Sequence, residues 1–129
     1  MPLVKLDMFE GRSDAEIESL LNAVQDCVVD AFGVPPRDRY QIVNEHKKGR
    51  MVFEDTGLGF ERSAALINIQ VFTSPRATAA KQRFMRLTAD RLETEFGLAQ
   101  TDLMISFVTN TDADWSFANG EAQYLTGAL

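Results

Sequence analysis

Cysteine and histidine each occur only once in this chain of 129 residues. The lone Cys27 cannot form an internal disulfide, and it falls among apolar residues at helical spacing, so we expect a buried structural thiol. The single His46 lies beside two lysines in a polar segment, which is typical of a surface residue. No group of histidine, cysteine and carboxylate residues has the spacing of a zinc site, so no metal is expected.

The chain also lacks a long apolar run and an excess of positive charge. No stretch approaches the about 18 apolar residues that span a bilayer, and the first residues lack the charged-then-apolar layout of a signal peptide. A formal net charge of −6 argues against binding to nucleic acid or to an anionic membrane surface. Phosphate-binding glycine loops and nucleophile-elbow motifs are absent as well. These absences predict a cytoplasmic protein with no cofactor and no nucleic-acid or membrane partner.

The first part of the chain shows a strand pattern, a helix pattern and a second strand pattern. Apolar residues alternate over residues 3–8, which is typical of a half-buried strand. Ser13 and Glu16 form a capping-box signature, and Gly33 is placed to end the helix that follows. A second strand is predicted over about 40–45. The apolar residues of the helix recur at steps of three and four: Ile17, Leu20, Leu21, Val24, Cys27, Val28 and Ala31.

The same order of patterns returns later in the chain. Residues 46–63 are polar and rich in glycine, which predicts a loop or hairpin, with a short edge strand at 51–53. A strand is then predicted over 64–73, a helix over 77–96 and another strand over 102–109. The buried stripe expected on this second helix consists of Phe84, Met85, Ala89, Leu92 and Phe96.

The two parts can be overlaid as copies of one β-α-β unit. Val4, Leu6 and Met8 fall on apolar residues of the later strand at an offset of 63, and Asp38 falls on Asp102 at an offset of 64. We therefore predict an α+β, two-layer fold with repeat halves at about 2–45 and 64–109, within one domain over 1–129 that ends in a segment at 110–129. Right-handed crossovers would place both helices on one face of a four-stranded mixed sheet.

The opposite face of such a sheet would be uncovered in a monomer. Leu66 and Phe72 point to it, so we expect assembly of several copies around this face. The C-terminal segment carries Trp115, Phe117 and Tyr124 among small polar residues, and a disordered tail rarely holds three aromatic residues. We expect this segment to pack against another part of the protein.

Three residues are candidates for chemistry. Removal of Met1 would leave Pro2 with a secondary amine, which is a neutral base or nucleophile when desolvated and a protonated acid beside a carboxylate. Arg76 lies where a strand passes into a helix N-terminus, a place suited to binding an anion. Asp38 lies between two arginines. Each has an ordinary interpretation too: a Met-Pro start without a chemical role, a solvated arginine, and an aspartate in a turn or ion pair.

Longer motifs accompany these residues. They are the Met-Pro-Leu start, Phe-Gly-Val-Pro-Pro-Arg-Asp-Arg-Tyr at 32–40, Asp-Thr-Gly-Leu-Gly-Phe-Glu-Arg-Ser at 55–63, Asp-Ala-Asp-Trp-Ser-Phe at 112–117 and Tyr-Leu-Thr-Gly at 124–127. Together with the doubled unit, they resemble malonate semialdehyde decarboxylase, a group within the tautomerase superfamily. The likeness covers almost the whole chain. The Pro-Arg-Asp-Arg and tail motifs are specific to this group, whereas the terminal proline is shared by the whole superfamily.

The resemblance implies a homotrimer whose open sheet faces point inward. It also implies cofactor-independent decarboxylation of malonate semialdehyde or a similar 3-oxo acid, accompanied by hydratase activity. The Pro2 amine would be protonated and act as an acid toward the substrate carbonyl, Asp38 would support its charge, and Arg76 would bind the substrate carboxylate. The substrate pocket would be walled by three apolar residues: Trp115, Phe117 and Tyr124.

Ser74 departs from the pattern of that group, in which a second arginine stands two residues before the first. A single Arg76 can still hold a carboxylate through two N–H donors, so the activity class is kept while the substrate is left open. Ser74 is counted with Arg76 among the substrate-binding residues. Two alternatives are a keto–enol tautomerase or hydratase of a 2-oxo or unsaturated acid, with Pro2 as a neutral base, and a non-catalytic assembly domain.

Overall fold

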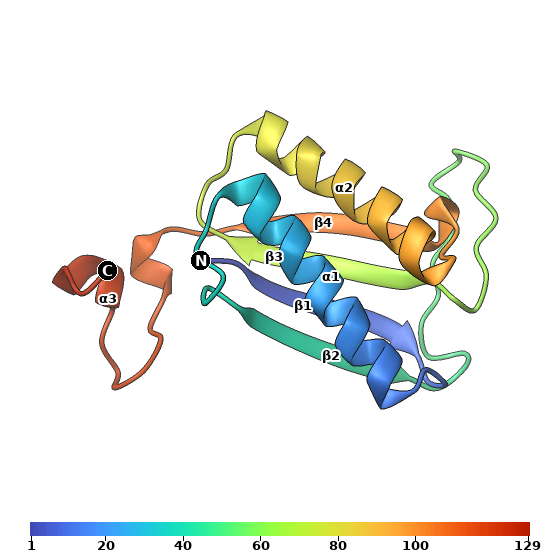
Figure 1. The fold of residues 1–129 in the computed structure, drawn as a ribbon, viewed down its shortest axis with the longest axis horizontal. Coiled ribbons are helices and arrows are strands. Elements are labelled where there is room, and N and C mark those ends of the chain that lie inside the picture. The colour runs from blue at the N-terminus through green and yellow to red at the C-terminus, as the bar shows by residue number, and fades with distance from the viewer.

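Four strands form one mixed sheet in the computed structural model, which describes all of residues 1–129 (Figure 1). The central pair, β1 and β3, is antiparallel, and each of these strands has a parallel neighbour on its outer side, β2 and β4 respectively. The spatial order is β2 (Tyr40–His46), β1 (Leu3–Phe9), β3 (Ile67–Thr73) and β4 (Leu103–Thr109).

Two helices of 19 residues each, α1 (Asp14–Phe32) and α2 (Thr78–Phe96), lie side by side on one face of this sheet (Figure 1). The predicted fold class, with its tandem β-α-β units, is confirmed. The helix ends also follow the sequence signals. The Ser13 hydroxyl accepts a hydrogen bond from the Glu16 N–H (3.2 Å), and Gly33 and Gly97 end the two helices in the left-handed conformation, with φ of 65° and 67°.

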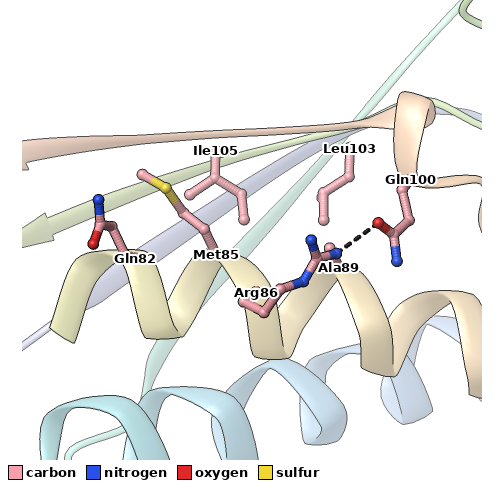
Figure 2. Close-up of a pocket in the computed structure, with 7 residues that line it drawn as sticks. All are labelled: Gln82, Met85, Arg86, Ala89, Gln100, Leu103 and Ile105. Atoms are coloured by element: carbon pink, nitrogen blue, oxygen red, sulfur yellow. Dashed lines mark hydrogen bonds between the residues drawn. The ribbon is translucent and has the colours of Figure 1, made fainter. Parts of the chain in front are cut away.

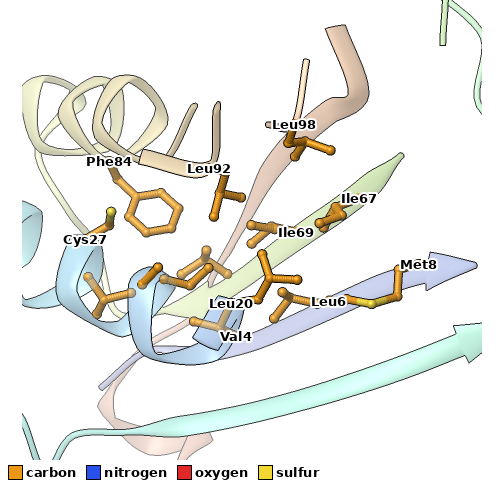
Figure 3. Close-up of a cluster of buried hydrophobic side chains, with 14 of the residues drawn as sticks. Val4, Leu6, Met8, Leu20, Cys27, Ile67, Ile69, Phe84, Leu92 and Leu98 are labelled. Atoms are coloured by element: carbon orange, nitrogen blue, oxygen red, sulfur yellow. The ribbon is translucent and has the colours of Figure 1, made fainter. Parts of the chain in front are cut away.

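The helices and the helix-facing strand residues enclose one apolar core (Figure 3). Phe84 of α2 is fully buried, and its ring centroid lies 5.5 Å from that of Phe32 and 5.8 Å from that of Phe107. Cys27 is buried in the same core, where burial raises the pKa of its thiol, so the predicted buried cysteine is confirmed. The inward residues of the central strands are Val4, Leu6, Met8, Ile67, Ile69 and Val71.

Some predicted details are wrong. Residues 51–53 form no strand, because the segment pairs with no strand of the sheet. The loop that follows is held by Arg62, which donates to the carbonyls of Glu54 and Thr101. β3 begins at residue 67 rather than 64, since residues 64–65 form an exposed turn. Met85 is 38% exposed, and the buried stripe of α2 instead runs at four-residue steps through Phe84, Thr88 and Leu92.

The remaining elements are short. They are the 3-10 turns η1 (Gln100–Asp102) and η2 (Asp112–Asp114) and the single helical turn α3 (Gln123–Thr126). The last two belong to the C-terminal segment, which extends beyond the sheet at the end where the N-terminus lies (Figure 1). No helix combines the length and apolar character needed to cross a membrane.

The second face of the sheet carries no helix. The strand registers put Tyr40, Ile42, Met104 and Val108 on this face, where each is between 39% and 44% exposed. His46, expected at the surface, is half-buried there and lies 2.8 Å from the Asp7 carboxylate. Apolar side chains therefore share this open face with polar ones.

Replacing Phe84 with alanine should lower the free energy of unfolding by about 3–5 kcal/mol, because the change removes a buried ring and leaves a cavity between two other rings. The neighbouring Met85→Ala is the matched control and should change it by less than about 1 kcal/mol, since Met85 is 38% exposed. Urea unfolding followed by circular dichroism measures both values. Equal losses would contradict the assigned buried face of α2.

Candidate active site

The sheet brings the candidate residues to one of its ends. β1 and β2 start at this end, and β3 and β4 finish there, with Leu3 paired to Tyr40 on one side and to Phe72 on the other. Pro2 is therefore flanked by the segment that precedes β2 and by the segment that follows β3. The Asn110 N–H donates to the Thr73 carbonyl (2.8 Å) and holds the start of the C-terminal segment at this same end.

The N-terminal amine is enclosed here. Pro2 is buried and Met1 is 9% exposed, and the Met1 ammonium donates a hydrogen bond to the Tyr124 hydroxyl (2.9 Å). Burial lowers the pKa of this amine, and the positive charge of Arg76 lowers it further, whereas the carboxylates of Asp38 and Asp112 raise it. Arg76 and Asp38, the charged residues expected near Pro2, thus shift the pKa of the terminal amine. Asp112, which was not predicted, shifts it as well.

Arg76 presents a free guanidinium edge. Its Nε donates to the Thr73 hydroxyl (3.1 Å), and its guanidinium lies over the ring of Phe32, 5.3 Å from the centroid. Its two terminal nitrogens bond no protein group. Helix α2, which follows, has Ala77 as its N-cap residue and no side-chain cap, so its first N–H groups are also unpaired. This arrangement suits a carboxylate held through two parallel N–H donors.

Asp38 lies on the loop between α1 and β2, where its N–H donates to the Pro35 carbonyl (2.9 Å). Its carboxylate makes no hydrogen bond or ion pair with the protein. The repeat counterpart Asp102 behaves differently: it is buried and accepts hydrogen bonds from the N–H and the hydroxyl of Ser63, both at 2.6 Å. Of the two equivalent aspartates, Asp38 alone is available to a ligand or to the terminal amine.

The aromatic residues of the C-terminal segment pack against one another and, as expected for this segment, against another part of the protein, the ring of Tyr40. Trp115 stacks on Phe117 with centroids 5.5 Å apart, and Phe117 meets the ring of Tyr124 edge-on at 5.5 Å and lies 5.7 Å from Tyr40. The Trp115 N–H donates to the Asn110 side-chain oxygen (2.8 Å). The wall is not wholly apolar, because the Tyr124 hydroxyl faces the amine; burial and the charge of Asp38 raise its pKa.

Ser74 lies between Thr73 and Arg76, half-buried and without a side-chain hydrogen bond. Sequence reasoning missed Thr73, which holds the Arg76 guanidinium, and Tyr40, which extends the aromatic cluster. It also missed Asp112, although this residue opens the Asp-Ala-Asp-Trp-Ser-Phe motif. Membership in that motif was the signal that could have identified Asp112.

Two hollows lie elsewhere on the molecule. A groove of about 430 Å³ runs between α2 and β4, lined by Met85, Ala89, Leu103 and other residues (Figure 2). A hollow of about 580 Å³ lies at the opposite end of the sheet, beside Phe9 and the 46–63 loop. Neither is lined by the candidate residues. No group of three or more histidine, cysteine or carboxylate residues is placed to hold a metal ion.

The sheet of tandem β-α-β units, with a proline at the start of its first strand, defines a tautomerase fold. A family model described as tautomerase enzyme matches residues 38–118, and a second model with the same description matches residues 2–61. The probable tautomerase YrdN of Bacillus subtilis (strain 168) is 51% identical over 129 residues, which is the whole of both chains.

Solved structures agree. Malonate semialdehyde decarboxylase, studied for its decarboxylase and hydratase activities, superimposes with a TM-score of 0.95 at 49% identity over 98% of both chains. FG41 malonate semialdehyde decarboxylase inhibited by 3-bromopropiolate gives a TM-score of 0.92 at 38% identity, over 98% of this chain and 97% of the other. The chain belongs to the tautomerase superfamily and, within it, to the family of malonate semialdehyde decarboxylase-like proteins.

The charges around the terminal amine can be tested one at a time in the chain that retains Met1. Arg76→Gln should raise the pKa of this amine, because a neighbouring positive charge is lost, and Asp38→Asn should lower it, because a negative charge is lost. The exposed Arg83, which pairs with Asp30, supplies the control variant Arg83→Gln, with no expected change. An NMR pH titration of the terminal amine measures all three, and shifts of the opposite sign would refute this arrangement.

Proposed function

We propose that the protein, with Met1 removed, catalyses cofactor-independent decarboxylation of malonate semialdehyde or a similar 3-oxo acid in the cytoplasm. One observation carries the proposal: the N-terminal amine, which Met1 carries in the structure, is surrounded by Arg76 with a free guanidinium edge, an unpaired carboxylate and the aromatic residues of the C-terminal segment. The reaction class is supported by the 49% identity to malonate semialdehyde decarboxylase over 98% of both chains.

Removal of Met1 frees the Pro2 nitrogen and also empties the space that Met1 fills. That space adjoins the Tyr124 hydroxyl, which bonds the amine in the longer chain. A small oxo acid placed there can direct its carboxylate to the terminal N–H groups of Arg76 and its carbonyl to the Pro2 amine. Ser74 offers a hydroxyl in the same connection. The substrate would therefore be held at both ends.

The chemistry follows from where electrons must go. When the bond between the carboxylate and its neighbouring carbon breaks, the electron pair moves toward the substrate carbonyl and gives an enol-type species with loss of carbon dioxide. A cationic Pro2 amine that donates a hydrogen bond to the carbonyl oxygen stabilises the developing charge. In a covalent variant, the neutral Pro2 amine attacks the carbonyl carbon, the carbonyl oxygen leaves as water, and the resulting iminium accepts the electron pair. The aromatic wall of Trp115 and Phe117 favours a carboxylate that leaves as neutral carbon dioxide.

Asp38 supports the cationic state of Pro2 in this mechanism. Its carboxylate raises the pKa of the terminal amine, as does that of Asp112, in opposition to burial and Arg76. An unpaired carboxylate beside the amine also suits the orientation of a water molecule, which would account for hydratase activity toward unsaturated acids.

A second candidate is a keto–enol tautomerase or hydratase acting on a 2-oxo or unsaturated acid. Two observations favour it: burial and Arg76 lower the pKa of the terminal amine, and Ser74 supplies no second guanidinium. Such an enzyme needs a neutral Pro2 as base, whereas the decarboxylase needs the cation. An NMR titration of the Pro2 nitrogen distinguishes the two, since a pKa well below 7 excludes the cationic mechanism.

Purified protein without Met1 should convert malonate semialdehyde to acetaldehyde. Pro2→Ala and Arg76→Ala should each lower kcat/KM by about 100-fold or more, because one changes the acid and the other removes the carboxylate anchor. Arg83→Ala, a change of an exposed arginine paired with Asp30, is the control with full activity. If Arg76→Ala keeps its full kcat/KM, Arg76 does not bind the substrate carboxylate. If the protein without further changes produces no acetaldehyde, the decarboxylase proposal fails and the tautomerase alternative is left.

We also infer that the open sheet faces of three copies meet in a homotrimer. This is supported by the exposed Tyr40, Ile42, Met104 and Val108 on that face. A fused 4-OT solved as a symmetric trimer shares the fold, with a TM-score of 0.78 at 21% identity over 97% of this chain and 98% of the other.

Analytical ultracentrifugation should give three times the protomer mass of 14.4 kDa. Ile42→Asp should weaken the assembly, because a charge on the open face would be buried between copies. Thr94→Asp on the exposed surface of α2 is the matched control and should leave the trimer intact. A monomer at micromolar concentration for the unmodified chain would exclude the trimer.

A further inference from the structure

The loop that carries Asp38 has few ties of its own. Pro35 and Pro36 have no backbone N–H, and the loop's internal backbone hydrogen bond is that from Asp38 to Pro35 (2.9 Å). The Asp38 carboxylate has no protein partner. The direction of this carboxylate therefore depends on how the backbone at residue 38 is held.

Gln25 of α1 holds the backbone of the loop at residues 36 and 38. This residue is 5% exposed, and its side-chain nitrogen donates to the Pro36 carbonyl (3.2 Å) and to the carbonyl of Asp38 itself (3.3 Å). A buried amide without partners is unfavourable, and the two loop carbonyls satisfy its donors. One side chain thus fixes the loop on both sides of Arg37.

Other bonds between α1 and the start of β2 bypass this loop. Arg39 donates to Asn22 and to Gln41, each at 2.8 Å, and these bonds are exposed to solvent. Gln41 in turn donates to the Leu21 carbonyl (2.8 Å). These contacts hold β2 against the helix and none of them reaches residues 36–38.

The equivalent positions of the second repeat allow a comparison with Gln25 and Asp38. At an offset of 64, Gln25 corresponds to Ala89 and Asp38 to Asp102. Asp102 is anchored through its own carboxylate by Ser63, so no glutamine is required behind it. The Asp38 carboxylate is unpaired, and this residue is anchored through its carbonyl instead. The glutamine occurs in the repeat that keeps its aspartate unpaired.

We propose that Gln25 is a positioning residue that directs the Asp38 carboxylate toward the N-terminal amine by holding the carbonyls of Pro36 and Asp38. The proposal rests on the proposed function in one respect, namely that Asp38 supports the charge of Pro2. Gln25 itself touches neither the amine nor the substrate.

The test uses the protein without Met1 and the variant Gln25→Met, which keeps the length of the side chain and removes its donors. The pKa of the Pro2 nitrogen should fall toward the value in Asp38→Asn. With malonate semialdehyde, kcat should fall about 10-fold while KM changes less than about 2-fold, because Arg76 is untouched. Gln41→Met, which removes the bond to Leu21 and the bond from Arg39, is the matched control and should leave the Pro2 pKa and kcat unchanged.

A double-mutant cycle tests whether Gln25 acts through Asp38. In the Asp38→Asn background, Gln25→Met should produce no further change in the Pro2 pKa or kcat. Additive effects, or a Gln25→Met protein that loses only thermal stability, would overturn the proposal. Gln25→Asn is the milder variant if Gln25→Met fails to fold, and it should shift the pKa in the same direction. The titration needs no substrate, so it tests Gln25 even when the decarboxylase assay fails.

Discussion

The antiparallel pairing of β1 with β3 decides where every other part of this molecule lies. It joins two β-α-β units through their first strands, so that the start of one strand lies beside the end of the other. A shift of one residue in this register would turn Val4, Leu6 and Met8 away from the helices and expose the core. The same register sets Pro2 next to the connection that carries Arg76. Core packing and site assembly are therefore consequences of one strand pairing.

Much of the fold could be predicted because its signals are local. Alternation in the strands, the Ser13 cap and the glycines after each helix report on neighbouring residues alone. The choice between Phe84 and Met85 as the buried residue of α2 could not be predicted, because it depends on how the helix is rotated against α1 and the sheet. The same holds for residues 51–53, because whether a short apolar run becomes an edge strand depends on whether the fold gives it a strand to pair with.

The candidate site also contains residues that could be predicted from the sequence and residues that could not. Pro2, Asp38 and Arg76 were accessible from chain position, helix-terminus chemistry and likeness to a known family. Gln25 was not, because a glutamine within a helix pattern is ordinarily a solvent-facing residue, and its partners become visible only when the loop folds back on α1. Asp112 was missed because its charge reaches the terminal amine through the fold of the C-terminal segment.

The two β-α-β units differ in how their equivalent aspartates are held, and they also differ in chain connectivity. The first unit begins at a free chain end, whereas the strand of the second unit is joined to a loop and cannot offer an amine. Only the first unit can build a site around a terminal nitrogen. The second unit is correspondingly closed, with Asp102 bonded to Ser63 and Ala89 in place of the glutamine.

Met1 is 9% exposed and its ammonium is held by the Tyr124 hydroxyl, so the folded chain offers no extended terminus to an aminopeptidase. If Pro2 acts as proposed, Met1 has to be removed, yet folding buries the residue that the peptidase must reach. A peptidase then needs this end of the chain to be unfolded or opened. A folded chain that keeps Met1 fills the space beside Tyr124 with its own first residue, so the amount of active protein depends on how completely Met1 is removed.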